Sequence, residues 1–461
     1  MATGTSPPVL SKAALPDEDA KTIASQVGVS QQVPGKETEY PDGGLRAWLV
    51  VAGVPGKETE YPDGGLRAWL VVAGGFAITF STALVLYISI LSGLKYGLGI
   101  PSILPGDYAS QRFPFENVFQ AYYQETMLPN VSPSKIAWIG SIQYALVFLP
   151  GLVTGRMFDL GYYRGPQLTA ASVFVAGTFL TAECKEYWQF LLCQGFAVGL
   201  GCGFLFGPMI AVIAHWFKAR RGVAIGIAAS GSSVGGTIIP IVARQLIPMI
   251  GFKWAIRVIS FILMAVVAVA IVTSRRRLPP VHVSGGLLNL KAFRYAPFTL
   301  YVWAALLAWL GLYSVLTYLQ VYAKEVGISP NLIPYLISIS NAASFVGRIS
   351  SGYLSDHIGP LNALIPSTMV TGIATFAWPF ARSDGALIAI ACIYGGSLGF
   401  FTGTWQMPPT TMGSVDDVGR RIGMLMSIIT IGALAGPPSS GAIRDATGSF
   451  EYVGYYAGED R

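Results

Sequence analysis

Gly195-Phe-Ala-Val-Gly-Leu-Gly-Cys-Gly-Phe-Leu-Phe-Gly207 carries a glycine at every fourth position, and 200 residues later Gly395-Gly-Ser-Leu-Gly-Phe-Phe-Thr-Gly403 carries the same pattern. The paired arginines that follow the first stretch, Arg220-Arg221, return at the same offset as Arg420-Arg421. Each copy is too long for a solenoid repeat and consists mostly of apolar runs. The sequence therefore predicts two homologous halves of a membrane-embedded helix bundle, an architecture typical of transporters.

The composition indicates a protein whose main solvent is lipid. Of its 461 residues, 52% are hydrophobic and 12% are charged, and the mean hydropathy is +0.54, whereas about a quarter of the residues in soluble domains are charged. Runs of about 18 to 20 apolar residues mark membrane-spanning helices. The sequence contains eleven such runs, at residues 66–90, 136–155, 166–182, 188–217, 222–247, 254–273, 298–322, 332–354, 363–380, 386–407 and 422–443.

These runs predict an all-α integral membrane fold of two pseudo-symmetric six-helix bundles, with the twelfth helix missing. The first bundle covers residues 66–274, a cytoplasmic linker covers 275–297, and the second bundle covers 298–461 with five spans. The residues after Arg444 are interrupted by acidic side chains and are too few to cross a bilayer.

The amino-terminal region has two unusual features. Residues 1–65 are rich in Ser, Pro, Lys and Glu, which predicts a disordered cytoplasmic tail without a secretory signal. Within this region begins a tandem repeat, because residues 33–53 and 54–74 are identical, but only the second copy continues into a full apolar run. Residues 91–117 form an atypical insertion rich in Gly and Pro where the first span should end. An extracytoplasmic loop and retained non-coding sequence both explain this insertion.

Lys and Arg concentrate in alternate loops, and this asymmetry sets the orientation of the chain in the membrane. With the amino terminus inside, the cytoplasmic loops receive Arg156, Arg164, Lys218, Arg220, Arg221, Arg275, Arg276, Arg277, Lys291, Arg294, Arg420 and Arg421. The net charge of +6 therefore reflects membrane topology, and no nucleic-acid-binding module is visible. We expect a monomeric multi-pass protein of the plasma membrane, with the lipid bilayer as its surroundings.

The residue pattern argues against an enzyme, a metal site and a bound cofactor. His215, His282 and His357 are far apart in the sequence, and no carboxylate pair or nucleophile constellation appears. No Gly-x-x-x-x-Gly-Lys loop occurs, which excludes a fused ATPase. The four cysteines show no disulfide framework.

The two glycine ladders each form a smooth stripe along one helix face. Their members are Gly195, Gly199 and Gly203 in the first half and Gly395, Gly399 and Gly403 in the second. Such a stripe lets a neighbouring backbone approach closely in lipid. Simple tight packing explains each glycine alone, while their pairing across the halves suits helices that rock against one another.

A second correspondence, at an offset of 197 residues, joins Gly155-Arg-Met-Phe-Asp159 to Gly352-Tyr-Leu-Ser-Asp356. Both aspartates follow the carboxyl end of a span, where the helix dipole disfavours an anion. The spans that begin after Arg220-Arg221 and Arg420-Arg421 offer positive helix ends and guanidinium donors in compensation. We expect contacts that latch one conformation and break in the other, with ordinary loop ion pairs as the alternative.

The same two motifs carry a family resemblance. Gly155-x-x-x-Asp159 and Gly352-Tyr-Leu-Ser-Asp356-His-Ile-Gly359 resemble the signature that follows the second and eighth helices of the major facilitator superfamily. The resemblance implies the major facilitator fold, in which twelve helices surround a central cavity. It also implies that a small organic anion is moved by rocking of the two halves, commonly with a proton.

Three further segments resemble the fungal monocarboxylate-transporter-like branch of this superfamily. They are Tyr61-Pro-Asp-Gly-Gly-Leu-Arg-Ala-Trp69, Val118-Phe-Gln-Ala-Tyr-Tyr-Gln-Glu125 and Gly226-Ile-Ala-Ala-Ser-Gly-Ser-Ser-Val-Gly235. In that branch the first helix continues directly into the second of these segments, and a twelfth helix follows the eleventh. This chain departs from the branch at both points.

The resemblance also singles out Arg348 as a candidate for binding an anion. Arg348 precedes Asp356 by eight residues, which places it roughly 12 Å inside the cytoplasmic boundary at 1.5 Å per residue. An arginine at that depth costs roughly a few to over ten kcal/mol unless it lines a wet cavity or finds a partner. Its planar fork suits a carboxylate. Animal monocarboxylate carriers pair this arginine with an aspartate one turn earlier, where this chain has Ser344. A structural arginine bonded to backbone carbonyls is the alternative.

Other polar residues inside the spans are further candidates for binding the substrate, namely Asn341, Tyr313, Gln143 and Gln406. Hydrogen bonds between helices explain them equally well.

Taken together, the sequence predicts a secondary transporter of a monocarboxylate or a related small organic acid. It would work by alternating access, with or without a coupled proton. Two alternatives remain open, an exporter of a fungal secondary metabolite and a non-transporting sensor or inactive truncated relative.

Overall fold

The computed structural model describes residues 63–94, 127–128, 131, 133–277, 286–412 and 417–459. The chain divides into two compact units, Met1–Ala47 and Trp48–Arg461, and all described residues belong to the second. Within these ranges every regular element is a helix. The first copy of the tandem repeat, nearly all of the 91–117 insertion and the segment Val118–Glu125 lie outside the described residues.

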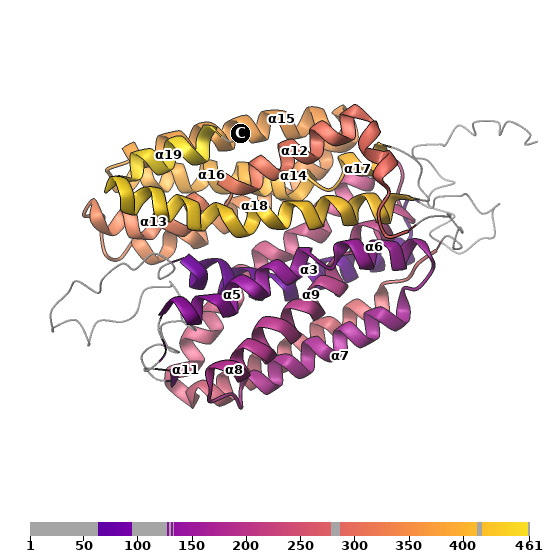
Figure 1. The fold of residues 1–461 in the computed structure, drawn as a ribbon, viewed down its shortest axis with the longest axis horizontal. Coiled ribbons are helices and arrows are strands. Elements are labelled where there is room, and N and C mark those ends of the chain that lie inside the picture. The colour runs from indigo at the N-terminus through magenta and orange to yellow at the C-terminus, as the bar shows by residue number, and fades with distance from the viewer. Residues whose placement is uncertain are drawn as a thin grey trace, which may run out of the picture. The chain divides into compact units, whose positions relative to one another are not determined.

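The first half of the described chain supplies six predicted spans (Figure 1). Its helices are α3 (Leu66–Leu94), α5 (Pro133–Phe148), α6 (Gly151–Asp159), α7 (Arg164–Thr181), α8 (Tyr187–Phe190), the π-helical segment η2 (Leu191–Val198), α9 (Gly199–Phe206), α10 (Met209–Ala214) and α11 (Arg221–Thr273). The fifth and sixth spans form the single element α11. They are separated at Gly251, whose φ of +77° no side chain adopts easily.

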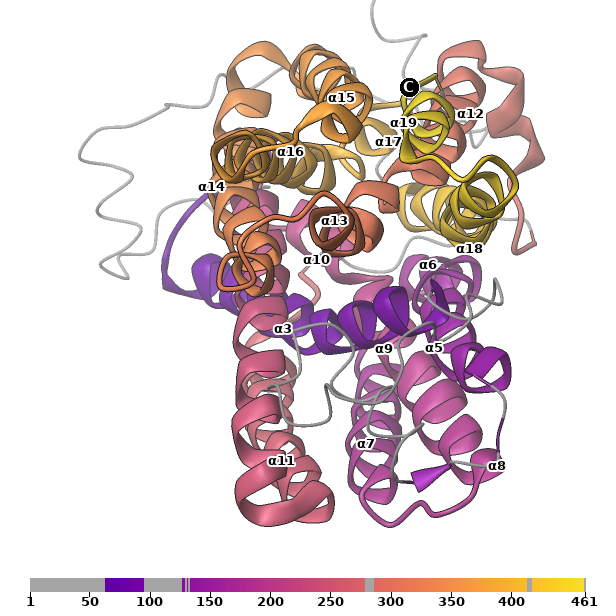
Figure 2. The same cartoon turned by 90° about the vertical axis from the view of Figure 1, so that its left-hand side faces the viewer.

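The second half supplies five predicted spans and one further helix. Its elements are η3 (Leu290–Arg294), α12 (Ala296–Gly311), α13 (Ser314–Glu325), η4 (Ile333–Tyr335), α14 (Leu336–Ile358), α15 (Pro360–Ala377), η5 (Trp378–Phe380), α16 (Asp384–Thr404), α17 (Pro408–Thr411), α18 (Val418–Thr447) and α19 (Phe450–Glu459). Figure 2 shows the bundle from one end, with α14 beside α16 and with α11 of the first half reaching α14.

All eleven predicted spans are helical in the structure. Within the described ranges, nine helical stretches are also long and apolar enough to cross a membrane. The two remaining predicted spans, α7 and α14, are helices of 18 and 23 residues that are not among these apolar stretches. Both bury polar side chains, such as Gln167 in α7 and Asn341 in α14, because they face other helices rather than lipid alone.

Four of the predicted spans are interrupted near their middles or toward one end, and proline explains three of these breaks. The second span breaks at Pro150 between α5 and α6, and the fourth breaks at Pro208 between α9 and α10. The tenth breaks before the pair Pro408-Pro409, which begins α17. Proline lacks the N–H that would bond to the carbonyl four residues earlier. The seventh span breaks at Leu312 and Tyr313 without a proline.

Side chains from neighbouring helices donate to carbonyls at these breaks. Gln167 Nε2 donates to Phe204 O at 2.9 Å, and Phe204 is the residue whose helical partner would have been Pro208. At the other breaks, Tyr301 donates to Trp405 O, Tyr394 to Leu312 O, and Ser427 to Leu149 O. Because irregular backbone inside a membrane is tolerated only when its polar groups are satisfied by protein or water, these bonds permit the breaks.

The two glycine ladders pack inside each half. A methyl group at Gly199 would meet Leu146 Cβ of α5 at 3.0 Å, and one at Gly203 would strike the Leu146 carbonyl. In the second half, a methyl group at Gly395 or Gly399 would strike the backbone of α14. Gly195 is less confined, with its nearest neighbour, Ile139 O of α5, at 3.5 Å. The ladders therefore fix α9 on α5 and α16 on α14, and other glycines form the contacts between halves.

The last described helix, α19, has ten residues and so a length of about 15 Å, too short to cross a bilayer. It packs against the second half. Its Phe450 ring lies 5.4 Å from the ring of Trp378, and the Ala457 carbonyl lies where a side chain at Gly311 would have to fit.

Candidate functional site

The two halves meet through matched carboxylate contacts at one end of the bundle, which we call the basic end because the predicted cytoplasmic arginines Arg220 and Arg420 lie there. At this end Asp356, in the last turn of α14, accepts hydrogen bonds from the backbone N–H groups of Gly222 (2.6 Å) and Val223 (2.9 Å). These donors are the first N–H groups of α11, which have no partner within the helix. A second-half carboxylate thus caps a first-half helix.

The reciprocal contact joins α6 to α18. Asp159 accepts hydrogen bonds from the backbone N–H groups of Gly419 at 3.1 Å and Arg420 at 2.9 Å. The positive end of the α18 dipole favours the carboxylate. In this case a first-half carboxylate caps a second-half helix, so each half holds the other at the basic end.

The arginines near these contacts also bind other groups. The guanidinium of Arg420 pairs with Asp417, and that of Arg421 donates to Met412 O at 2.9 Å. Arg221 donates to Thr410 Oγ1 of α17 at 3.2 Å, which adds one more bond between the halves. The backbone N–H of Arg220 donates a hydrogen bond to Asp63 Oδ1 at 3.4 Å. Backbone N–H groups at the starts of α11 and α18 therefore donate the hydrogen bonds described here to the two aspartates.

Glycines bring the backbones of the halves into contact beside these carboxylates. A methyl group at Gly155 would strike the Gly419 carbonyl, and a methyl group at Gly222 would strike the Gly352 carbonyl. These two pairs correspond in the sequence, since Gly352 follows Gly155 and Gly419 follows Gly222 by the same 197 residues. The same backbone contact between the halves therefore occurs twice at the closed basic end, at positions that the sequence repeat relates.

The opposite end carries ion pairs within each half, and Arg444 pairs with Glu325 in the second half. Lys253 and Arg257 both bind Glu183 at 2.6 Å, and the hydrogen bond from Lys253 holds the pKa of the Glu183 carboxyl below its usual range. All three residues belong to the first half. This ion-pair cluster therefore stabilises one half and does not join the two.

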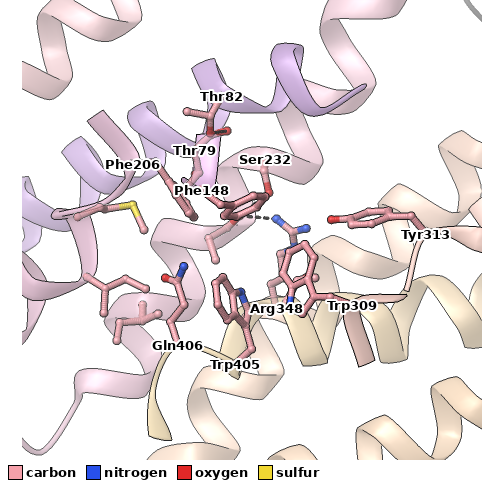
Figure 3. A pocket seen from close by; sticks show the side chains of 16 residues that line it. Thr79, Thr82, Phe148, Phe206, Ser232, Trp309, Tyr313, Arg348, Trp405 and Gln406 are labelled. Carbon is pink, nitrogen blue, oxygen red and sulfur yellow. Dashed lines mark hydrogen bonds between the residues drawn. The ribbon is translucent and has the colours of Figure 1, made fainter. Parts of the chain in front are cut away.

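A cavity lies between the halves in the interior of the bundle (Figure 3). It encloses about 560 Å³ of empty space, including the part that is open to solvent. Its lining residues are Thr79, Thr82, Phe148, Phe206, Met209, Ile210, Ile225, Ala229, Ser232, Trp309, Tyr313, Arg348, Thr402, Gly403, Trp405 and Gln406. Many of them flank the helix breaks, which places irregular backbone against a cavity, as expected inside a membrane.

Arg348 is the charged residue among these lining side chains. Its Nη1 donates to Ala229 O of α11 at 2.7 Å, so the guanidinium reaches across to the other half. Figure 3 shows the Tyr313 hydroxyl directed toward the same guanidinium. The arrangement gives the cavity one positive charge, and no acidic side chain is part of its described lining.

Aromatic rings form much of the remaining wall. The Trp309 ring lies 5.1 Å from that of Phe148 and 5.2 Å from that of Trp405. The Phe206 ring lies 6.1 Å from that of Phe148, and that of Tyr313 lies 5.9 Å from Trp309. These contacts, three of them edge to face and that of Tyr313 with Trp309 tilted, fix the rings in place. The result is a rigid apolar wall with one cationic group.

The structure brings together three of the five predicted binding residues. Arg348, Tyr313 and Gln406 line the cavity. Gln143 is buried where α5 meets Gly199 of α9, and Asn341 is buried on α14; neither is part of the described lining. Sequence reasoning overlooked Trp309 and Phe148, because aromatic residues inside apolar runs look like ordinary core positions.

Comparison with known proteins shows which family shares this architecture. A sequence model of the Major Facilitator Superfamily matches residues 71–437. The chain is 35% identical to the aspyridones efflux protein apdF of Emericella nidulans, over 73% of this chain and 69% of that protein. It is 37% identical to the fujikurins efflux protein of Gibberella fujikuroi, over 70% of each chain.

Solved structures share the fold at low sequence identity. The human organic anion transporter MFSD10 (TETRAN) superposes with a TM-score of 0.63 and 16% identity, over 85% of this chain and 96% of that one. At this identity the similarity concerns the arrangement of helices alone.

Proposed function

Since this chain belongs to the Major Facilitator Superfamily and is a multi-pass membrane transporter, we propose that it exports an organic anion, of the kind that fungi make as secondary metabolites, from the cytoplasm. The observation that carries this proposal is the cavity between the halves, whose described lining has Arg348 as its charged member. A guanidinium at this depth is costly unless it meets water or an anion.

The closed basic end supports alternating access as the mechanism. The Asp159 and Asp356 contacts join the halves on the side predicted to face the cytoplasm. In the proposed cycle they break to admit the anion from the cytoplasm and form again when it leaves on the other side. We also propose that the protein works as a monomer in the plasma membrane.

The proposed direction of transport rests on the names of two similar proteins. Two similar fungal proteins are named efflux proteins, which favours export of a metabolite over the monocarboxylate uptake that the motifs suggest. Uptake of a monocarboxylate remains the second candidate, because Arg348 suits any carboxylate. The cavity does not favour a proton-carrying acid, since Ser344 bonds to Ser233 across the halves at 3.3 Å where the animal carriers have aspartate.

Export can be tested in yeast cells that lack their own organic-acid exporters. The cells are loaded with a fluorescent aromatic acid through its membrane-permeant ester, and the rate of outward loss is measured. We expect the protein to accelerate this loss, Arg348→Gln to abolish the acceleration, and Arg294→Gln, an exposed residue of η3, to preserve it.

Equal loss from cells with and without the protein, at matched surface delivery, would contradict export. Faster entry of labelled lactate or pyruvate under the same conditions would instead establish the monocarboxylate alternative. If the protein accelerates neither movement, the remaining alternatives are a non-transporting sensor and an inactive relative.

A further inference from the structure

Two buried N–H groups on the cavity wall have no hydrogen-bond partner among the described residues. They are the indole Nε1 of Trp309 and the amide Nε2 of Gln406. The side chains are 2% and 3% exposed respectively, so bulk water does not reach them. Buried donors without partners are rare in native proteins and call for an explanation. Both side chains line the same cavity as Arg348.

These groups select for a ligand that accepts hydrogen bonds. Indole and guanidinium nitrogen atoms can only donate. Trp309, Gln406 and Arg348 all belong to the second half, so the acceptors of a bound ligand would lie on that side of the cavity. Ionised oxygens are the strongest acceptors for such donors, because charge-assisted hydrogen bonds are shorter and stronger than neutral ones.

Four hydroxyl groups of the wall already donate to backbone carbonyls. Thr79 donates to Ala228 O at 2.5 Å, and Ser232 donates to Ala229 O at 2.9 Å. Thr82 and Thr402 likewise donate to backbone carbonyls of their own helices. These four residues can therefore offer acceptor oxygens but no further donors. A ligand that carries a phenolic or enolic hydroxyl could donate to them.

The aromatic wall sets the shape of the ligand. Trp309, Trp405 and Phe148 hold one another edge to face, and a flat conjugated ring system gains more from such a wall than a saturated ring does. A three-carbon acid such as lactate has no ring to pack against this wall and would leave most of the lining rings without contact.

We propose that the cavity binds a planar, conjugated organic acid, with its ionised oxygens on Arg348, Trp309 Nε1 and Gln406 Nε2 and its ring system against the aromatic wall. This assignment rests on the proposed function and adds the chemical class of the cargo. Neither saturated acids nor neutral aromatic compounds meet both conditions.

The assignment can be tested with purified full-length protein and 1-hydroxy-2-naphthoate, a fluorescent planar hydroxy acid, by equilibrium dialysis. Matched competitors are 1-hydroxy-2-naphthamide, which lacks the charge, and cyclohexanecarboxylate, which lacks the planar ring. We expect the naphthoate to bind at least about tenfold more tightly than either competitor, because the naphthamide loses the charge-assisted bonds and the cyclohexanecarboxylate loses the contact of a planar ring with the aromatic wall. Equal binding of either competitor would overturn the assignment.

Variants then test the individual donors. Trp309→Phe keeps an aromatic ring and removes the N–H, and Gln406→Met keeps the approximate volume and removes the amide. We expect each to weaken naphthoate binding about five- to tenfold. The matched controls are Trp378→Phe and Gln320→Met, because both residues are buried with an unpartnered polar atom outside this cavity. We expect the controls to change binding less than about twofold.

The binding and export results separate the two proposals. If the cavity variants behave like the controls while their melting temperatures match the unsubstituted protein, the assignment of the donors is wrong, whatever the cells export. If the naphthoate binds with the expected pattern but loaded cells lose no acid, the cavity chemistry stands and the export proposal fails.

Discussion

Arg348 holds in the second half the position that Gly151 holds in the first. Each precedes the capping aspartate of its half, Asp356 or Asp159, by eight residues. Their backbones make the same contact, since the Gly151 carbonyl lies against Gly423 and the Arg348 carbonyl lies 2.5 Å from the position of a methyl group at Gly226. The repeat therefore conserves the backbone contact between halves, while only the second copy adds a guanidinium to the cavity.

This asymmetry predicts that Arg348→Ala abolishes transport but changes the stability of the fold only slightly. The contact between halves at this position is made by the carbonyl, which alanine keeps. We expect transport to be lost, while the free energy of unfolding changes by no more than about 1 to 2 kcal/mol, the size of one or two hydrogen bonds. Thermal melting of purified protein and the export assay measure the two effects. A collapse of melting temperature together with transport would assign Arg348 a structural role.

The backbone contacts at the basic end predict a second effect. Gly155→Ala or Gly352→Ala places a methyl group against a carbonyl of the other half, and overpacking of this kind costs roughly 1 to 3 kcal/mol. We expect the closed arrangement to lose that amount relative to the open one. The distance between spin labels at Arg164 and Lys291, both exposed at the basic end, should shift toward longer values.

The control for this experiment is Gly165→Ala, where a methyl group would meet open space. It should leave the distance distribution unchanged. An unchanged distribution in the Gly155 and Gly352 variants as well would show that these contacts do not control opening.

The carboxylate caps predict a matched pair of effects. Asp159→Asn and Asp356→Asn remove the charge that the helix ends of α18 and α11 favour, and each should weaken the closed state by about 1 to 2 kcal/mol. Because the two sites are related by the repeat, we expect similar effects and near-additivity in the double variant. The same spin-label distances report the result. Asp384→Asn is the control, since Asp384 bonds to Ser329 within the second half.

Asp63 predicts an effect on stability rather than gating. Its Oδ1 accepts backbone hydrogen bonds from Lys218 at 2.5 Å and Ala219 at 2.8 Å, just before α11 begins. Loss of such a cap costs about 1 kcal/mol. We expect Asp63→Ala to lower the melting temperature and Asp63→Asn, which also tolerates the φ of +44° at this residue, to lower it less. Equal melting of both variants and the parent would show that the cap contributes nothing.

Apolar runs were sufficient to locate the spans, because a bilayer leaves few ways to satisfy a backbone. They also found α7 and α14, which have more polar faces. The breaks at Pro150, Pro208 and Pro408 were visible as prolines, yet the runs gave no sign that the helices would stop there. Whether a proline kinks or breaks a helix depends on donors from elsewhere, such as Gln167 and Tyr301, and a single segment does not contain that information.

The site was predictable only where a residue is out of place in lipid. The family resemblance singled out Arg348, whose charge is costly at that depth, and the repeated motif singled out the two aspartates, which oppose a helix dipole. Trp309 was missed because a buried tryptophan is ordinary, and its significance lies in an indole N–H without a partner. The sequence pointed to the positive helix ends and the guanidinium groups as partners of the aspartates, and the backbone N–H groups where α11 and α18 begin bond to them.

The most direct test of the account is the accessibility of position 348 from each side of the membrane. In a background in which the four native cysteines are replaced, Arg348→Cys is exposed to a membrane-impermeant thiol reagent. We expect labelling from the extracytoplasmic side in the resting protein, and labelling from the cytoplasmic side when Asp159→Asn and Asp356→Asn are added. A correctly inserted protein that reacts from neither side in either background would contradict the central claim that two halves alternate around this cavity.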